Sequence, residues 1–219
     1  MFYRPLIDDH GLPHDPFKSC VIPRPIGWIS TLSKDGIPNL APYSQFTNAT
    51  FNPPYVLFSA NQTIDEQRKD TVVNIEATGV FVWNMATYAL RDAVNASSEQ
   101  YPPGTDEFAA AGLEKKKATL SDTPMVKASP VQFECRYYTT LRLPGNAPMG
   151  SVDIVIGRVE AIHIADEVID KNGMLDVPRI QPIARCGYYQ YTTVKDVFEM
   201  KPPATIEQGL EGRVGKAKL

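Results

Sequence analysis

Two histidines near the start of the sequence are the first side chains whose spacing could support chemistry. His10 and His14 lie four residues apart among three aspartates, a set of side chains that could ligate a metal ion. Gly11 and Pro13 interrupt the segment, so no helix can bring the two imidazoles onto one face. We therefore interpret it as a polar N-terminal loop and expect no metal site.

The patterns of the common catalytic sites are also missing. The sequence has no GxGxxG dinucleotide fingerprint, no GxxxxGK[ST] phosphate loop and no GxSxG nucleophile elbow. The third histidine, His163, lies between two isoleucines, which favours an outward-facing or hydrogen-bonded strand residue. No nucleophile or acid–base set emerges, and we expect no catalytic side chain. Any reaction is then that of a bound cofactor, which the protein holds and orients.

Composition and charge exclude several classes of function. A formal net charge of -3 argues against nucleic acid as the main partner, since phosphate binding needs clustered Lys and Arg. The one basic cluster, Lys115–Lys117, is interpreted as a solvated helix face. No apolar run is long enough to span a membrane, and the first residues lack the apolar core of a signal peptide. Three isolated cysteines suit a reducing compartment, so we expect a cytoplasmic protein without a membrane partner.

The elements that must position a cofactor are mainly strands. β-branched and aromatic runs, bounded by glycine and proline turn signals, predict a mostly β, barrel-like fold with peripheral helices. Strict alternation of apolar and polar residues marks one long half-buried strand, and a second long strand follows it as an antiparallel partner. The predicted strands are 26–32, 38–46 (the return after a turn at 34–36), 55–59, 79–85, 131–143 and 150–164.

We expect a single domain over residues 1–219, with an N-terminal arm over 1–18 and a C-terminal arm over 201–219. The C-terminal arm is either extended over a neighbouring subunit or frayed. A short helix is predicted over 66–77 with Asp70 as its N-cap, and a helical insertion over 87–127.

A series of ordered motifs spans residues 15 to 200. Taken singly they are unspecific, but their order and spacing together are specific. The chain resembles the flavin-reductase-like, FMN-binding split-barrel family, and its flavoredoxin-like branch most closely. That resemblance implies a six-stranded antiparallel split β-barrel, a homodimer, and FMN bound near the subunit interface. The motifs are 23–31, 39–48, 52–59, 69–75, 81–84, 129–135, 156–159 and 184–191.

The same resemblance implies which residues approach the flavin. A flavin ring needs hydroxyl and amide groups along its polar edge, and Ser44, Thr47 and Asn48 gather these on one predicted loop. The phosphate needs cations or a helix N-terminus, which the segment 69–71 offers. The structural alternatives are that Ser44 and Thr47 are turn hydroxyls and that Asp70 only caps a helix. The implied cofactor-binding residues are Arg24, Ser30, Thr31, Pro42, Tyr43, Ser44, Thr47, Asn48, Ser59, Ala60, Asn61, Lys69, Asp70 and Thr71, with Arg185 as a further candidate.

Three functions follow as hypotheses. The first is an FMN-dependent oxidoreductase, in which NADH or NADPH reduces the flavin and a partner monooxygenase or other acceptor takes the electrons. The second is an electron-transfer or flavin-carrier protein without efficient NAD(P)H oxidation. The third is a split-barrel module that binds no flavin. Tyr43 bears on the choice, because the monooxygenase branch typically has a small residue there and a tyrosine could partly close the nicotinamide site.

Overall fold

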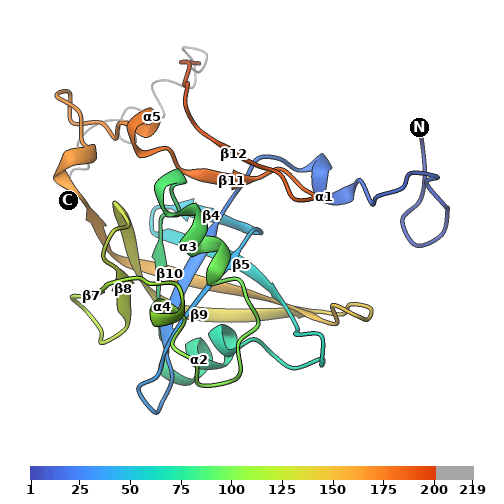
Figure 1. The fold of residues 1–219 in the computed structure, drawn as a ribbon, viewed down its shortest axis with the longest axis horizontal. Helices are drawn as coiled ribbons and strands as arrows, with labels where there is room; N and C mark the ends of the chain where they lie inside the picture. Colours follow the sequence, from blue (N-terminus) through green and yellow to red (C-terminus); the bar gives the residue numbers. More distant parts are fainter. Residues whose placement is uncertain (201–219) are drawn as a thin grey trace.

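A computed structural model describes residues 1–200 of the chain. Within them the largest element is a seven-stranded antiparallel sheet with the order β3-β2-β6-β9-β10-β5-β4, which curves into the barrel of Figure 1. The resemblance implied six strands, one fewer than the sheet contains. The edge strand β4 pairs only with β5. The strands are β2 (Gly27–Leu32), β3 (Pro38–Tyr43), β4 (Phe46–Phe51), β5 (Pro54–Asn61), β6 (Val80–Asn84), β9 (Val131–Leu143) and β10 (Val152–Ile164).

The long hairpin of β9 and β10 confirms the predicted antiparallel pair. Its register runs from Val152 opposite Leu143 to Ile164 opposite Val131, with two irregularities along the way. Gly157 lies at the first of these, where a Cβ atom would be 2.4 Å from the ring of Phe81. Only a glycine lets β10 pass this close to a core aromatic ring.

The expected alternation along β9 is only partly seen. Gln132 and Glu134, predicted on the polar face, are buried. The reason is that the segment after residue 117 covers this face: the Glu134 carboxylate accepts the backbone N–H groups of Thr119 and Leu120, both at 2.8 Å. His163 Nε2 lies 2.6 Å from Glu134 Oε1, so the prediction of a hydrogen-bonded strand histidine is confirmed.

Two small sheets flank the barrel. One has three strands, β1 (Arg24–Pro25), β11 (Ile183–Arg185) and β12 (Tyr191–Thr193), and the other pairs β7 (Lys115–Lys117) with β8 (Pro124–Val126). The interpretation of 115–117 as a helix face is therefore wrong. The backbone of 115–117 pairs with the buried strand β8, while the lysine side chains remain in solvent. Charge composition alone could not reveal this pairing.

The helices are short. They are α1 (Phe17–Cys20), α2 (Asp70–Thr78), η1 (Tyr88–Leu90), α3 (Arg91–Ala96), α4 (Glu107–Ala110), η2 (Asp166–Val168) and α5 (Val177–Ile180). The predicted insertion over 87–127 is therefore mixed, since it holds η1, α3 and α4 but also β7 and β8.

Helix α2 begins later than predicted. Asp70 is its first helical residue, Lys69 occupies the N-cap position, and no side chain caps the end. The N-cap prediction for Asp70 is wrong, because a cap must keep an extended backbone and here that residue is Lys69. The helix ends at Gly79, whose positive φ of 76° places its N–H on the carbonyl of Ile75.

Two apolar clusters hold the barrel together. One fills the barrel interior, and the other lies between β2, β3 and the insertion, where it includes Trp28 and Phe108. Both tryptophans are buried, and each indole N–H is satisfied: Trp28 donates to Ser97 Oγ at 2.9 Å and Trp83 to the Ile26 carbonyl at 3.0 Å.

The N-terminal arm lies apart from the barrel (Figure 1). The N-terminal arm runs away from it in Figure 1, and its two histidines pack edge-on against different tyrosines, His10 on Tyr3 and His14 on Tyr188. The predicted C-terminal arm, 201–219, falls outside the described residues. No helix in the described part of the chain is long and apolar enough to cross a membrane.

Candidate functional site

Two cavities meet at the end of strand β3. Pro42, Tyr43 and Lys69 line both of them. The larger, about 730 Å³, also borders the N-terminal segment and β11, and is called the basic cavity below. The smaller, about 230 Å³, lies between the N-terminus of α2, the loop 97–103 and α4, and is called the acidic cavity.

The basic cavity carries uncompensated positive charge. Lys18, Arg24, Lys69 and Arg185 line it, and Asp15 is the only carboxylate among its described lining residues. No ion pair within 4 Å involves any of these four cations among residues 1–200. An anionic ligand would therefore find positive charge that no ion pair within the described residues has neutralised.

Neutral groups hold the two arginines in place. The Arg24 guanidinium donates to the Ser44 carbonyl at 3.1 Å and to the Val21 carbonyl at 2.6 Å. The Arg185 guanidinium donates to the Tyr191 hydroxyl at 2.6 Å and lies 4.7 Å from the centre of that ring. Carbonyl and hydroxyl acceptors fix the orientation of each side chain without cancelling its charge.

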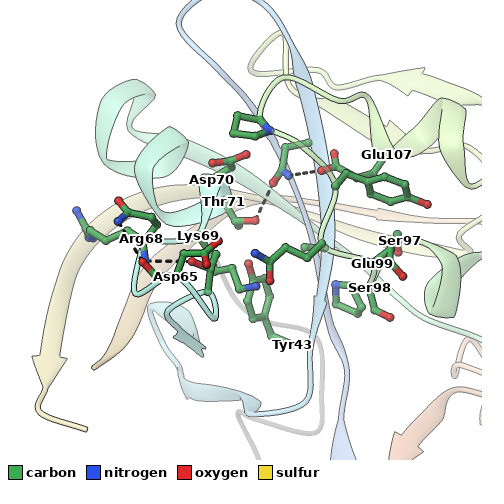
Figure 2. A pocket seen from close by; sticks show the side chains of 18 residues that line it. Tyr43, Asp65, Arg68, Lys69, Asp70, Thr71, Ser97, Ser98, Glu99 and Glu107 are labelled. Carbon is green, nitrogen blue, oxygen red and sulfur yellow. Dashed lines mark hydrogen bonds between the residues drawn. The ribbon is translucent and has the colours of Figure 1, made fainter. Parts of the chain in front are cut away.

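The acidic cavity has the opposite character. Figure 2 shows Asp65, Asp70, Glu99 and Glu107 around it, together with Lys69 and Arg68. Arg68 is already neutralised outside the cavity, by Glu76 at 2.7 Å and Asp153 at 3.0 Å. Lys69 is then the single cation left to balance four carboxylates among the described lining residues.

A buried hydrogen-bond network forms one wall of the acidic cavity. Asn39 is its centre: its Oδ1 accepts from the hydroxyls of Thr71 at 2.7 Å and Thr31 at 3.3 Å, and its Nδ2 donates to Glu107 Oε1 at 3.0 Å. Asn74 extends the network by donating to Thr31 at 3.0 Å. These contacts tie α2 and α4 to strands β2 and β3, so the wall is rigid.

Glu107 is the buried acid of this wall. Its second oxygen accepts the backbone N–H of Leu40 at 3.1 Å, so both oxygens are engaged. Burial raises its pKa, against the hydrogen bonds from the backbone and from Asn39 that lower it. The position of Glu107 is fixed by the start of α4. Asp106, the N-cap, accepts the backbone N–H groups of Phe108 and Ala109, which makes Glu107 the first helical residue.

The Tyr43 hydroxyl is the unsatisfied polar group of the site. Its side chain is 8% exposed and its ring packs on Phe58 with centroids 4.8 Å apart, yet the hydroxyl has no hydrogen-bond partner in the described part of the chain. The neighbouring Thr71 has given its own hydrogen to Asn39. Burial raises the pKa of Tyr43, Thr71 offsets part of that rise, and the charges of Asp70 and Glu107 add to it.

Lys69 lies at the junction of the two cavities. It precedes the uncapped N-terminus of α2, whose first N–H groups point outward with a partial positive charge. The side chain is half-buried, and this burial lowers its pKa, partly offset by the charge of Asp70. A half-buried ammonium beside a free helix end is a ready place for an anion.

The structure places nine of the fourteen residues implied by the resemblance around the two cavities. Those that line the basic cavity are Arg24, Pro42, Tyr43, Ser44, Ser59, Asn61 and Lys69, with the further candidate Arg185. Those that line the acidic cavity are Pro42, Tyr43, Lys69, Asp70 and Thr71.

Three of the remaining residues lie inside the fold. Ser30 is fully buried and donates to the Pro124 carbonyl at 2.6 Å, while Thr31 belongs to the Asn39 network. Ala60 is part of the barrel interior. None of the three lines either cavity, because β2 is buried from Gly27 to Thr31 and Ala60 occupies a buried position of the alternating strand β5.

Thr47 and Asn48 lie on a strand rather than on a loop. The predicted loop 42–48 is the end of β3, a two-residue connection at Ser44 and Gln45, and the start of β4. Both side chains are exposed on this edge strand, where Thr47 donates to the Asn48 carbonyl at 3.1 Å. Neither residue borders the basic or the acidic cavity.

Several lining residues had no signal in the sequence. Lys18 reaches the basic cavity from α1 and Met149 from the β9–β10 loop, while Asn39 and Glu107 meet at the acidic one. These residues come from distant parts of the chain, so spacing could not have grouped them. The cap signal of Asp106 before Glu107 was the one local hint that this acid opens a helix.

Comparisons with known proteins place the geometry in context. A family model described as "Flavin reductase like domain" matches residues 19–182. An uncharacterised protein of Aquifex aeolicus is 34% identical over 171 residues, 78% of this chain and 84% of its own length.

Two solved structures extend the comparison. Nitrilotriacetate monooxygenase component B from Bacillus cereus superposes with a TM-score of 0.82 at 27% identity, covering 91% of this chain and 98% of its own. A flavin reductase with a split-barrel domain from Shewanella frigidimarina superposes with a TM-score of 0.71 at 22% identity, covering 82% of this chain and 86% of its own. The second likeness confirms the predicted split-barrel fold.

Proposed function

Because the chain belongs to the family of flavin reductase like domains, we propose that it is an FMN-binding oxidoreductase whose basic cavity holds the flavin. The observation that carries the proposal is the set of uncompensated cations around a cavity of about 730 Å³. A flavin mononucleotide ends in a phosphate, and a cavity of this size belongs to the range that small-molecule and cofactor sites occupy.

The polar groups of the cavity fit the parts of FMN. Ser44, Ser59 and Asn61 supply hydroxyl and amide groups for the polar edge of the ring, and Tyr188 and Tyr189 supply flat apolar walls. Lys69, Arg24 and Arg185 supply cationic donors for the phosphate. When bound, FMN supplies the capacity to accept a hydride from NADH or NADPH and to pass the electrons on.

The contribution of the chain is binding and orientation. The guanidinium groups of Arg24 and Arg185 are held by neutral acceptors, so they present fixed positive charge to an anionic ligand. Pro42 and Tyr43 form the wall between the two cavities and keep water away from that side. No side chain is assigned as acid, base or nucleophile, and catalysis rests on positioning.

A second copy of the chain completes the proposed site. Tyr189, which borders the cavity, is 95% exposed, and Phe17 in the adjacent α1 is 63% exposed. Large apolar side chains around a cofactor cavity are typical of a surface that another protein covers. We place that homodimer in the cytoplasm, where NADH and NADPH are available and the three free cysteines stay reduced.

The electron acceptor is a partner monooxygenase or another acceptor molecule. This part of the proposal is supported by the 27% identity to a monooxygenase component over nearly the full length of both chains.

A second candidate function is electron transfer or flavin carriage without efficient oxidation of NAD(P)H. The observation that favours it is the bulk of Tyr43, which is buried in the wall of the basic cavity and restricts access from that side.

One titration separates these functions. The full-length protein is reconstituted with FMN, freed of excess flavin and mixed anaerobically with NADH or NADPH while the visible flavin absorbance is followed. Rapid bleaching without a partner protein supports the oxidoreductase. Bound FMN that stays yellow with both dinucleotides supports the carrier, and failure to retain FMN rejects both functions.

A further inference from the structure

The acidic cavity is not accounted for by the proposed function. Flavin mononucleotide and the nicotinamide dinucleotides are anions, and four carboxylates with one free cation would repel them. Yet its wall is rigid, since the Asn39 network fixes Thr71 and Glu107 on either side. A preformed polar cavity of about 230 Å³ with this charge suits a different ligand.

Two of the carboxylates are free to bind that ligand. The side-chain carboxylates of Asp65 and Glu99 accept no hydrogen bond and form no ion pair within the described part of the chain, although both residues line the cavity. Asp70 lies at the α2 N-terminus beside Lys69, the one cation lining the cavity that forms no ion pair within the described residues. The negative charge of the cavity is therefore available to a cation.

The Tyr43 hydroxyl is a second and independent sign of a ligand. Buried hydroxyl groups in proteins almost always have a hydrogen-bond partner, and this one has none that meets hydrogen-bond geometry among residues 1–200. Figure 2 shows Tyr43 at the wall of the cavity with its hydroxyl directed toward Thr71, whose hydrogen is already donated to Asn39. The lone pairs of the Tyr43 oxygen accept no hydrogen from residues 1–200, so they are open to a donor on a bound ligand.

We propose that the acidic cavity is a second binding site, for a small organic amine in its ammonium form. The ammonium group donates to Tyr43 Oη and lies against the carboxylates of Asp65 and Glu99, and the short carbon chain rests on Pro42, Pro103 and the Tyr101 ring. An ammonium has three donors and no acceptor, which matches a cavity rich in free oxygens. The amine and the flavin would then bind on opposite sides of Tyr43, each in the cavity of opposite charge.

The test uses butylammonium as the probe and butyrate as its size-matched anion. Binding to the full-length protein is measured by titration calorimetry, with and without saturating FMN, so that a failure of flavin binding does not decide the result. We expect heat of binding from butylammonium and none from butyrate. Equal binding of the two probes, or no binding of butylammonium, overturns the proposal.

Three variants locate the probe. Glu99→Gln, on an exposed loop, should weaken butylammonium binding about threefold, the size of a surface charge contact. Tyr43→Phe, which removes only the hydroxyl, should weaken it about three- to tenfold, the size of one hydrogen bond. Asp92→Asn removes the same charge from α3 outside both cavities and should leave binding unchanged.

The variants also give the outcomes that count against the site. If Glu99→Gln and Asp92→Asn weaken binding equally, the probe is drawn by net charge and the acidic cavity is not its site. Unchanged binding in Tyr43→Phe removes the assigned hydrogen bond and overturns the proposed pose. Because the Glu99 side chain is exposed, its variant remains informative even if Tyr43→Phe is unstable.

Discussion

The basic and acidic cavities share a wall but differ in how their charges are treated by the rest of the protein. In the basic cavity the arginines are held by carbonyls and a hydroxyl, and their charge is retained. In the acidic cavity the one arginine, Arg68, is cancelled by Glu76 and Asp153. The comparison teaches that a charged side chain attracts a ligand only if its own hydrogen-bond partners leave its charge uncompensated. Its presence in the cavity is not sufficient.

The largest effect should come from Lys69, which both cavities share. Lys69→Gln removes the ammonium beside the α2 N-terminus and should weaken FMN affinity about 10- to 100-fold, the range for a hydrogen bond to a charged group. Fluorescence titration of FMN measures this. Lys127→Gln, which removes the same charge from a surface pair with Glu114, is the matched control. Equal affinity in both variants would show that the phosphate lies away from Lys69.

Glu107 should matter for stability where its neighbour Glu99 does not. Glu107→Ala leaves Asn39 Nδ2 and the Leu40 N–H without their acceptor, so the free energy of unfolding should fall by about 1–3 kcal/mol. Glu99→Ala should change it by less than about 0.5 kcal/mol, since that side chain is exposed. Urea denaturation compares the two. Similar losses would mean that the exposed acid is also part of the wall.

The ion pairs of Asp153 with Arg68 and Arg142 should stabilise the protein at neutral pH and be lost in acid. Burial alone would raise the pKa of Asp153, but hydrogen bonds and charge from Arg142 and Arg68 lower it overall. A lowered folded-state pKa stabilises the protein above the unfolded value, about 3.9, and this stability is lost as the pH falls below it. Asp153→Asn should therefore be less stable than the parent at neutral pH, with the difference shrinking in acid.

Denaturation at a series of pH values tests this, and Asp92→Asn serves as the control for an exposed aspartate. A constant difference between Asp153→Asn and the parent from neutral pH into acid would contradict the assigned ion pairs.

The smallest effect on stability should come from Tyr43→Phe. The hydroxyl makes no hydrogen bond with the described residues, so its removal should change the free energy of unfolding by less than about 0.5 kcal/mol. Thermal unfolding without added ligand is the measurement. A loss above 1 kcal/mol, a value typical of a satisfied hydrogen bond, would mean that the protein itself supplies a partner.

Patterns that depend on neighbouring residues were predictable. Alternation of apolar and polar residues over 131–143 predicted strand β9 with its correct bounds, and the turn before Pro38 predicted the β2–β3 hairpin. Both signals depend only on residues close together in the sequence. The same local rules failed where another segment intervened. Lys115–Lys117 became a strand because β8 offered a partner, and Gln132 and Glu134 became buried because the insertion covered them.

The candidate site follows the same division. The sequence by itself determined the β-rich class, the long hairpin, and a motif order that implied Arg24, Ser44, Ser59, Asn61 and Lys69 as cofactor ligands, all of which line the basic cavity.

Only the tertiary structure decided that Ser30 and Thr31 face inward, that Asn39 meets Glu107, and that Tyr43 separates two cavities of opposite charge. The physical reason is that charge balance and hydrogen-bond satisfaction are properties of groups brought together from distant segments. A single stretch of sequence specifies its own backbone preference but not which partners will reach it.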